Sequence, residues 1–286
     1  MLRAGHFLHP VRTARSAYGR LRRAAYRRIA AWQLRKCRRE TRDRCWCGGE
    51  LRPCKWHRGY GVCADCGCHV NLRPLAQEEL ARLYSFGLYW HVRQKMKGHP
   101  SIEQRAEHDR LDGRVDYWLG LVERYCPPAG QIVEVGCGHG VLLGELARRG
   151  YRCTGLEVDE KVAAWACERT NVDIRWGLFP GVQLPECDLF MAFDVIEHVS
   201  RPDEFMRAAA ALLRPGGAAI IQTPIERYGY EPPFGERFTA AFDEVEHLFL
   251  FTDLAMRELA ARSGLEIVSC DDRLWLHHEI CVFRKP

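Results

Sequence analysis

The chain has 286 residues, of which 47% are hydrophobic, and a formal net charge of +5. This length accommodates one α/β domain of ordinary size and a smaller module. No apolar run approaches the length of about eighteen residues that a membrane-spanning helix needs, and the basic N-terminus lacks the uninterrupted apolar segment of a secretory signal. We therefore expect a cytoplasmic protein.

The first 44 residues form an arm rich in arginine and lysine, opposed only by Glu40 and Asp43. Apolar residues recur in it at helical spacing: Tyr18, Leu21, Ala25, Ile29 and Trp32. A basic amphipathic helix can lie on an anionic membrane surface or contact an acidic protein, and it can also bind a nucleic-acid backbone. A disordered, solvated arm is the remaining alternative.

The net positive charge of the arm at 1–44 is larger than the net charge of the whole chain, +5. A basic groove over the rest of the protein is therefore not expected, which argues against nucleic acid as the partner. The interpretation that follows is a cytoplasmic protein whose arm contacts the inner face of a membrane or an acidic protein.

Residues 45–75 contain two close cysteine pairs, each followed by glycine and separated by fifteen residues: Cys45 and Cys47, then Cys63 and Cys66. Two thiolate pairs joined by a short hairpin are typical of a tetrahedral Zn²⁺ site. We interpret this segment as a zinc-ribbon-like module that folds around a structural Zn²⁺.

The first pair departs from the usual spacing, since it reads Cys-x-Cys and not Cys-x₂-Cys. Four neighbouring side chains therefore remain alternative zinc ligands: Cys54, His57, Cys68 and His69. A disulfide-bonded loop is a further alternative. The cysteines beyond residue 68 lie in apolar settings and are interpreted as small buried hydrophobic residues.

Residues 76–115 have a helical pattern rich in aromatic side chains: Tyr84, Phe86, Tyr89 and Trp90. As a lid, these rings could stack on a sugar or on another ring. They could instead form the interface between the zinc module and the rest of the chain, residues 116–286. A later loop, Tyr228–Gly235, has two prolines and two glycines and is a second candidate for a substrate cover.

The segment 131–147 reads as a buried strand, a loop with glycines at 136, 138 and 140, and a helix. Glycines permit positive φ angles and let a ligand touch the backbone, and the helix N-terminus offers unpaired N–H groups. About twenty residues later, Glu157 ends a second strand, where a carboxylate can accept hydrogen bonds from ribose hydroxyls. The pattern predicts a nucleoside-type binding site.

Four ordered motifs extend this pattern: Glu134-Val-Gly-Cys-Gly-His-Gly140, Gly155-Leu-Glu157, Asp188 to Val199 with Asp194-Val-Ile-Glu-His198, and Leu213-Arg-Pro-Gly-Gly217. Residues 116–286 thereby resemble a class I S-adenosylmethionine-dependent methyltransferase. The resemblance implies a Rossmann-like, seven-stranded, mostly parallel sheet with one antiparallel strand and helices on both faces. Together with the preceding module, the chain is similar to the zinc-ribbon-led methyltransferases of bacterial sugar, polysaccharide and natural-product pathways.

The same resemblance assigns the cofactor site. Glu134, Gly136, Gly138 and Gly140 would approach the methionine part of S-adenosylmethionine, and Glu157 would hold its ribose. Leu178 and Phe179 would flank the adenine, and Asp194 would border the methionine part and the acceptor.

The acceptor's proton needs a base, and histidine titrates in the useful range. His198 follows the fourth strand of the domain, and His247 is a second candidate. Asp194 could hold the acceptor or the cofactor amine. His198 could instead have a structural role, or it could bind a divalent metal with Glu197 and His247, a pattern that resembles the small-RNA 3′-end methyltransferases.

We therefore expect a methyltransferase that acts on a small molecule or glycan. The alternatives are an RNA methyltransferase that uses the arm, and a non-catalytic scaffold that only binds the cofactor.

Overall fold

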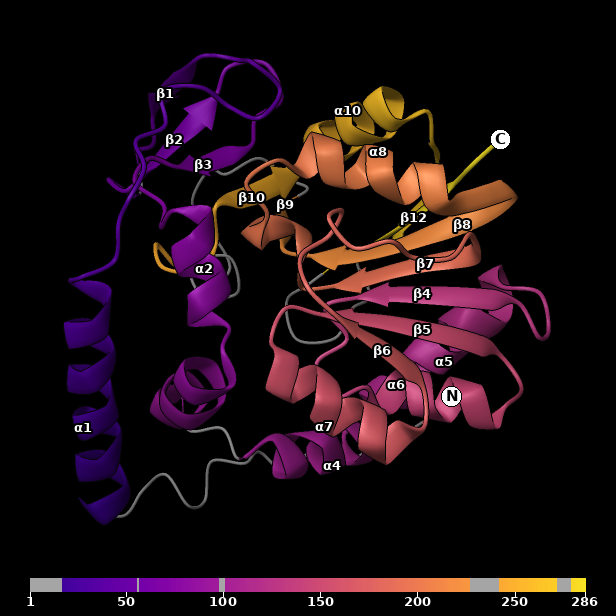
Figure 1. The fold of residues 1–286 in the computed structure, drawn as a ribbon. Helices are drawn as coiled ribbons and strands as arrows, with labels where there is room; N and C mark the ends of the chain where they lie inside the picture. Colours follow the sequence, from indigo (N-terminus) through magenta and orange to yellow (C-terminus); the bar gives the residue numbers. More distant parts are fainter. Residues whose placement is uncertain (1–16, 56, 98–100, 227–241, 272–278) are drawn as a thin grey trace, which may run out of the picture.

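The computed structural model describes residues 17–55, 57–97, 101–226, 242–271 and 279–286 (Figure 1). Two sheets organise this part of the chain. The larger carries the predicted cofactor motifs, and the smaller contains the cysteine-rich segment.

The larger sheet has seven strands in the order β11-β12-β8-β7-β4-β5-β6. Only β12 runs antiparallel to its neighbours. Its strands are β4(Gln131–Val135), β5(Arg152–Glu157), β6(Asp173–Trp176), β7(Cys187–Phe193), β8(Leu213–Thr223), β11(Glu266–Asp271) and β12(Glu279–Arg284). The predicted mostly parallel, seven-stranded sheet is confirmed.

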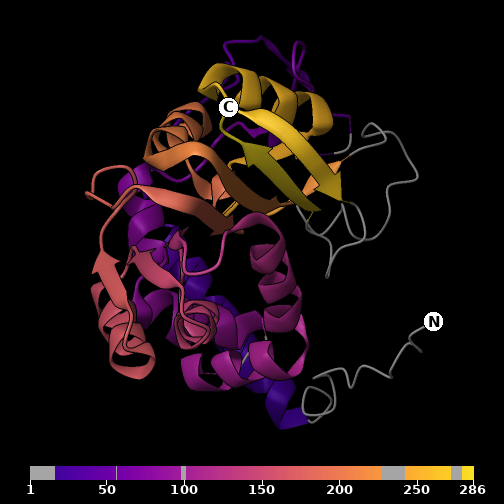
Figure 2. The same cartoon turned by 90° about the vertical axis from the view of Figure 1, so that its right-hand side faces the viewer.

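Helices cover both faces of this sheet (Figures 1 and 2). They are α5(Arg114–Tyr125), α6(Val141–Arg148), α7(Glu160–Thr170), α8(Pro202–Leu212) and α10(Asp253–Ser263). Successive strand residues point to opposite faces: Ile132 packs with α5 and α6, whereas Val133 packs with α8 and α10. The continuous apolar runs of the central strands follow from this burial on both sides.

The smaller sheet joins the cysteine-rich segment to the larger domain. It has five strands in the order β1-β2-β3-β10-β9, with β1(Leu51–Pro53), β2(Tyr60–Cys63), β3(His69–Asn71), β9(Ile225–Glu226) and β10(Phe249–Thr252). Strand β3 pairs antiparallel with β10, which comes almost 180 residues later. The hairpin at 51–71 thus continues into a sheet that β9 and β10 complete.

The remaining helices lie before α5 in the chain. They are α1(Ala17–Leu34), α2(Gln77–Leu83), the π-helical segment η2(Phe86–Arg93), α3(Gln94–Lys97) and α4(Ile102–Leu111). A short 3₁₀ turn, η3(Ile196–His198), follows β7. The predicted basic N-terminal helix is present as α1, which packs against η2 and α3. None of the helices that the structure describes is long and apolar enough to cross a membrane.

The interpretation of the later cysteines as small buried hydrophobic residues fails at two places. Cys167 of α7 is exposed, and one pair of cysteines is joined. Cys270 of β11 and Cys281 of β12 face each other across the antiparallel pair and form a disulfide. Cys281 was interpreted as a small buried hydrophobic residue because its neighbours in the sequence are apolar. The partner could not be identified, since the pairing depends on the register of β11 and β12.

Candidate active site

The glycine loop after β4 has the predicted conformation. Gly136, Gly138 and Gly140 all have positive φ angles, of 75°, 52° and 68°. Gly136 donates its N–H to Leu156 O at 2.8 Å, which ties the loop to β5. Gly140 is the N-cap of α6. A Cβ at position 138 would meet no protein atom within 4 Å, so this glycine leaves open space next to the loop.

This space belongs to a cavity of about 440 Å³. Seven of the eight predicted cofactor residues line it: Glu134, Gly136, Gly138, Glu157, Leu178, Phe179 and Asp194. Gly140 does not, because it faces α7, where a Cβ would meet Ala166 and Thr170.

Two buried carboxyl groups lie beside the loop. Glu157 accepts hydrogen bonds from the backbone N–H groups of Gly138, Val158 and Asp159, at 2.9, 2.8 and 3.2 Å. Burial raises its pKa. Burial and the neighbouring Glu157 raise the pKa of Glu134 to about 8. Within the described part of the chain, no group hydrogen-bonds Glu134 Oε2, so this atom can accept from a ligand.

Asp194 ends β7 in a left-handed conformation with a φ of 56°. Its Oδ1 accepts from Gln222 Nε2 at 2.8 Å, and Gln222 Oε1 accepts from Trp118 Nε1 at 3.1 Å. Trp118 also stacks on Phe193, with ring centroids 4.5 Å apart. The chain Trp118–Gln222–Asp194 holds the carboxylate at the cavity wall.

The sequence reasoning missed a polar group that lines the same cavity, formed by Arg105, Asp109, Arg114 and His139. Asp109 is buried and contacts Arg105 Nε at 2.8 Å and His139 Nε2 at 3.0 Å. Arg114 lies 3.8 Å from the same carboxylate, and these partners hold the pKa of Asp109 well below its usual range. Of these four residues, only His139 lies inside the glycine motif, so it alone could have been linked to the cavity from the sequence.

His198 also lines the cavity, with Tyr84, Tyr89 and Trp90 of the predicted lid segment. Its Nδ1 lies 2.7 Å from Glu246 O and 2.9 Å from Tyr84 Oη. Because a carbonyl can only accept, we assign the proton to Nδ1, which leaves a lone pair on Nε2. The pKa of His198 is lowered to about 4, mainly by burial and to a smaller extent by the nearby His247.

Glu246, whose backbone carbonyl contacts His198, is itself held in place by an ion pair. The buried Glu246 side chain pairs with buried Arg93 of η2, at 2.7 Å from Arg93 Nε. His247 does not line the cavity, but its ring centroid lies 4.9 Å from that of His198.

The three residues named as an alternative metal site also converge. One ligand atom from each of Glu197, His198 and His247 lies within 4.8 Å of the others. Glu197 Oε1 is 3.7 Å from His198 Nε2, and its Oε2 accepts from Thr223 Oγ1 at 2.9 Å.

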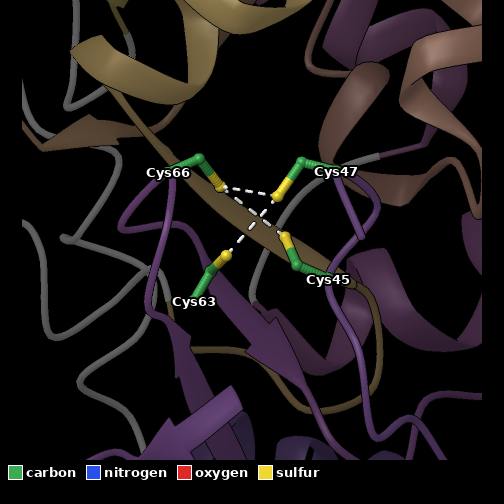
Figure 3. A group of neighbouring side chains, drawn as sticks. All are labelled: Cys45, Cys47, Cys63 and Cys66. Carbon is green, nitrogen blue, oxygen red and sulfur yellow. Dashed lines mark hydrogen bonds between the residues drawn. The ribbon is translucent and has the colours of Figure 1, made fainter. Parts of the chain in front are cut away.

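The four cysteines named as zinc ligands meet in one group (Figure 3). Sγ–Sγ distances are 3.7 Å for Cys45–Cys66, 3.5 Å for Cys47–Cys63 and 3.6 Å for Cys47–Cys66. A tetrahedron with Zn–S bonds of about 2.3 Å has sulfur atoms about 3.8 Å apart, so the spacing fits Zn²⁺.

Of the alternative zinc ligands, Cys68 adjoins the cluster, because its thiol hydrogen-bonds Cys45 and Cys66. The other contacts of these four residues are as follows. Cys68 Sγ donates to Leu250 O at 3.2 Å, Cys54 packs with Tyr60 and Leu250, and the His57 ring stacks on Phe242. His69 is buried with its ring edge-on to Phe242. The loop Tyr228–Gly235, predicted as a substrate cover, lies outside the described residues.

Known proteins resemble this chain in both sequence and fold. The family model described as "Methyltransferase domain" matches residues 75–270. A "Probable S-adenosylmethionine-dependent methyltransferase" of Mycolicibacterium smegmatis is 32% identical over 158 residues, which cover 48% of this chain and 61% of that protein. A "Ubiquinone biosynthesis O-methyltransferase" of Caulobacter vibrioides is 34% identical over 100 residues, which cover 32% of this chain and 40% of that protein.

Among solved structures, human N-acetylserotonin methyltransferase in complex with S-adenosylmethionine matches with a TM-score of 0.52 and 14% identity, covering 73% of this chain and 56% of that one. That likeness concerns the fold alone. This chain spans roughly half the length of the curated relatives above. Because the family model covers more than half of the chain, the protein belongs to the methyltransferase-domain family that its motifs predicted.

Proposed function

We propose that this protein transfers the methyl group of S-adenosylmethionine to a hydroxyl group of a small molecule or glycan. The observation that carries the proposal is one cavity lined both by the glycine loop with its carboxyl groups and by His198 with the aromatic side chains of Tyr84, Tyr89 and Trp90. Oxygen is preferred over nitrogen and carbon because curated relatives are named as O-methyltransferases.

The residues around the glycine loop fit the cofactor. The backbone at Gly138 is open to a ligand, and Glu157 would accept from the ribose hydroxyls. Leu178 and Phe179 would pack on the adenine, and the otherwise unsatisfied Glu134 Oε2 would accept from a cofactor N–H or O–H group.

The methionine end of the cofactor carries an ammonium and a carboxylate. Asp194 would attract the ammonium, while Arg105 and Arg114 offer guanidinium groups to the carboxylate. Each charged end would then meet an opposite charge in the cavity.

When bound, S-adenosylmethionine supplies a methyl group already activated by its sulfonium. The protein then has to orient the acceptor, exclude water and take up a proton. Tyr84, Tyr89 and Trp90 would pack on the acceptor, and His198 Nε2 would accept the proton of its hydroxyl. A base with a pKa of about 4 is adequate for this role, because an oxygen that is gaining a methyl group becomes strongly acidic.

For the cysteine cluster we propose one structural Zn²⁺ held by Cys45, Cys47, Cys63 and Cys66. Gly48 and Gly67, with φ angles of 96° and 70°, turn the backbone at the two cysteine pairs. Thr252 of β10 donates to Cys66 O at 2.6 Å. The zinc module would thereby hold β10 and the segment with Glu246 and His247 in register.

The proposal is tested with purified protein and labelled S-adenosylmethionine against hydroxylated aromatics, sugars, nucleotide sugars and RNA. Methylation of a hydroxylated small molecule or sugar is the expected result. Methylation of RNA alone would overturn the acceptor class, and tight cofactor binding without transfer to any acceptor would favour the scaffold alternative.

A further inference from the structure

The proposed methyl transfer makes no use of helix α1. This helix stands along one side of the molecule, away from the larger sheet, and packs on η2 and α3 (Figure 1). Its sequence, AYGRLRRAAYRRIAAWQL, contains no acidic residue.

The packed face and the outer face of α1 differ clearly. Ala30 is only 4% exposed, and Tyr26 and Leu34 are half-buried. These three positions recur at intervals of four residues, so they share one side of the helix. This side is the one that faces the protein.

The opposite side is apolar yet exposed. Leu21, Ile29 and Trp32 have exposed fractions of 71%, 44% and 58%, and spacings of eight and eleven residues place them in one stripe. Large apolar side chains on an exposed helix face leave hydrophobic area in water, so they mark a surface that an apolar medium can cover.

Cations border this stripe. Arg28, Arg35 and Lys36 are exposed, and Lys36 Nζ lies 4.1 Å from the centroid of the Trp32 ring. Residues 1–44 hold fourteen of the 42 lysines and arginines but only two acidic residues, which leaves the other 242 residues with a net negative charge. An anionic surface would therefore attract the molecule through this side and repel the rest of it.

We propose that α1 docks the protein on an anionic lipid surface, with Leu21, Ile29 and Trp32 in the interface and the arginines at the headgroups. A nucleic-acid backbone would use the cations but would leave the apolar stripe in water. The proposal goes beyond the methyl transfer and does not depend on it. Helix α1 packs on η2, and η2 supplies Tyr89 and Trp90 to the cavity wall. Docking through α1 would therefore bring the cavity close to the lipid surface.

The experiment is co-sedimentation of the full chain with vesicles of phosphatidylcholine alone and of phosphatidylcholine mixed with phosphatidylglycerol. We expect binding to the mixed vesicles only, weakened by high salt. The variant Leu21→Glu/Trp32→Glu and the variant Arg28→Glu/Arg35→Glu should each weaken vesicle binding more than about tenfold. Leu111→Glu, at an equally exposed apolar position outside α1, and Arg148→Glu/Arg149→Glu are the matched controls and should bind as the native chain does.

Circular dichroism of every variant checks that the fold is intact without reference to the cofactor. Failure of the native chain to bind the mixed vesicles would overturn the proposal, as would full binding by Leu21→Glu/Trp32→Glu. Binding of single-stranded RNA that depends on the arginines, with no vesicle binding, would overturn it in favour of a nucleic-acid contact. None of these results bears on whether the cavity binds the cofactor.

Discussion

His198 combines a low pKa with a fixed orientation. Its Nδ1 is held by Glu246 O, so replacing the ring removes a positioned acceptor of protons. We predict that His198→Ala lowers turnover by roughly 10²–10⁴-fold, with little change in cofactor affinity. Turnover of the native enzyme should stay level near neutral pH and fall as the pH drops through about 4, because the protonated ring cannot accept a proton. Near-normal turnover in His198→Ala would show that acceptor positioning alone carries the reaction.

His247→Ala separates the base from the alternative metal site. If His198 acts as a base, losing the neighbouring imidazole removes one cause of its low pKa, so the acidic limb of the rate profile should move to higher pH while activity persists. If Glu197, His198 and His247 bind a metal, His247→Ala and a chelator should both abolish activity, and Mg²⁺ or Mn²⁺ should restore the chelated enzyme. The zinc content must be measured alongside, so that loss of Zn²⁺ from the cysteine cluster is not mistaken for this effect.

Glu134 is buried with a pKa of about 8, against an ordinary value of 4.5. Between these two values the folded state binds more protons than the unfolded state, so stability falls as pH rises. We predict that Glu134→Gln raises the melting temperature of the cofactor-free protein by several degrees at pH 8 and has little effect near pH 5. Thermal melts across this range check the claim, and a difference that does not grow with pH would contradict it.

The sequence located the cavity-lining glycines and acidic residues at the ends of β4, β5 and β7. Glycines and acidic residues at strand ends have a direct local reason. It did not locate Arg105, Asp109, Arg114 or Trp118. These residues precede the glycine motif and reach the cavity only through the packing of α4 and α5 on the sheet. Helical periodicity alone does not say which polar side chain of such a helix meets a distant loop.

At the level of elements, the cysteine cluster gives the most direct prediction. The purified chain should contain about one Zn²⁺. Cys63→Ser should lose the metal and melt at a lower temperature, since the metal would cross-link the two cysteine pairs in the folded state. Cys167→Ser, at an exposed cysteine, is the matched control and should keep its zinc. Freshly reduced native protein without zinc would remove the zinc-ribbon interpretation.

Two strand pairings show where local sequence patterns stop being informative. The hairpin at 51–71 was visible from its cysteines, yet its pairing with β10 was not. A strand of three residues gives no sign of a partner almost 180 residues away. The disulfide between Cys270 and Cys281 was missed for the same reason. In both cases the deciding information is register, which the tertiary structure sets.

For the whole molecule, the seven strands and the single antiparallel strand followed from the family resemblance, and alternating strands and helices alone indicated a parallel sheet. Helical spacing also predicted the helix that the structure has at α1. Which face of that helix would be exposed was not predictable, since it packs on η2 and α3, which are distant in the sequence.

The central claim is that the cavity binds S-adenosylmethionine at the glycine loop. The most direct measurement is calorimetric titration of the cofactor into Gly138→Val, whose added side chain would enter the cavity and meet no protein atom at its Cβ. Gly216→Val is the matched control, because Gly216 also has a positive φ and open surroundings but lies outside the cavity. The account predicts that Gly138→Val loses cofactor binding while Gly216→Val retains it, with both variants folded by circular dichroism; an unchanged affinity in folded Gly138→Val would contradict it.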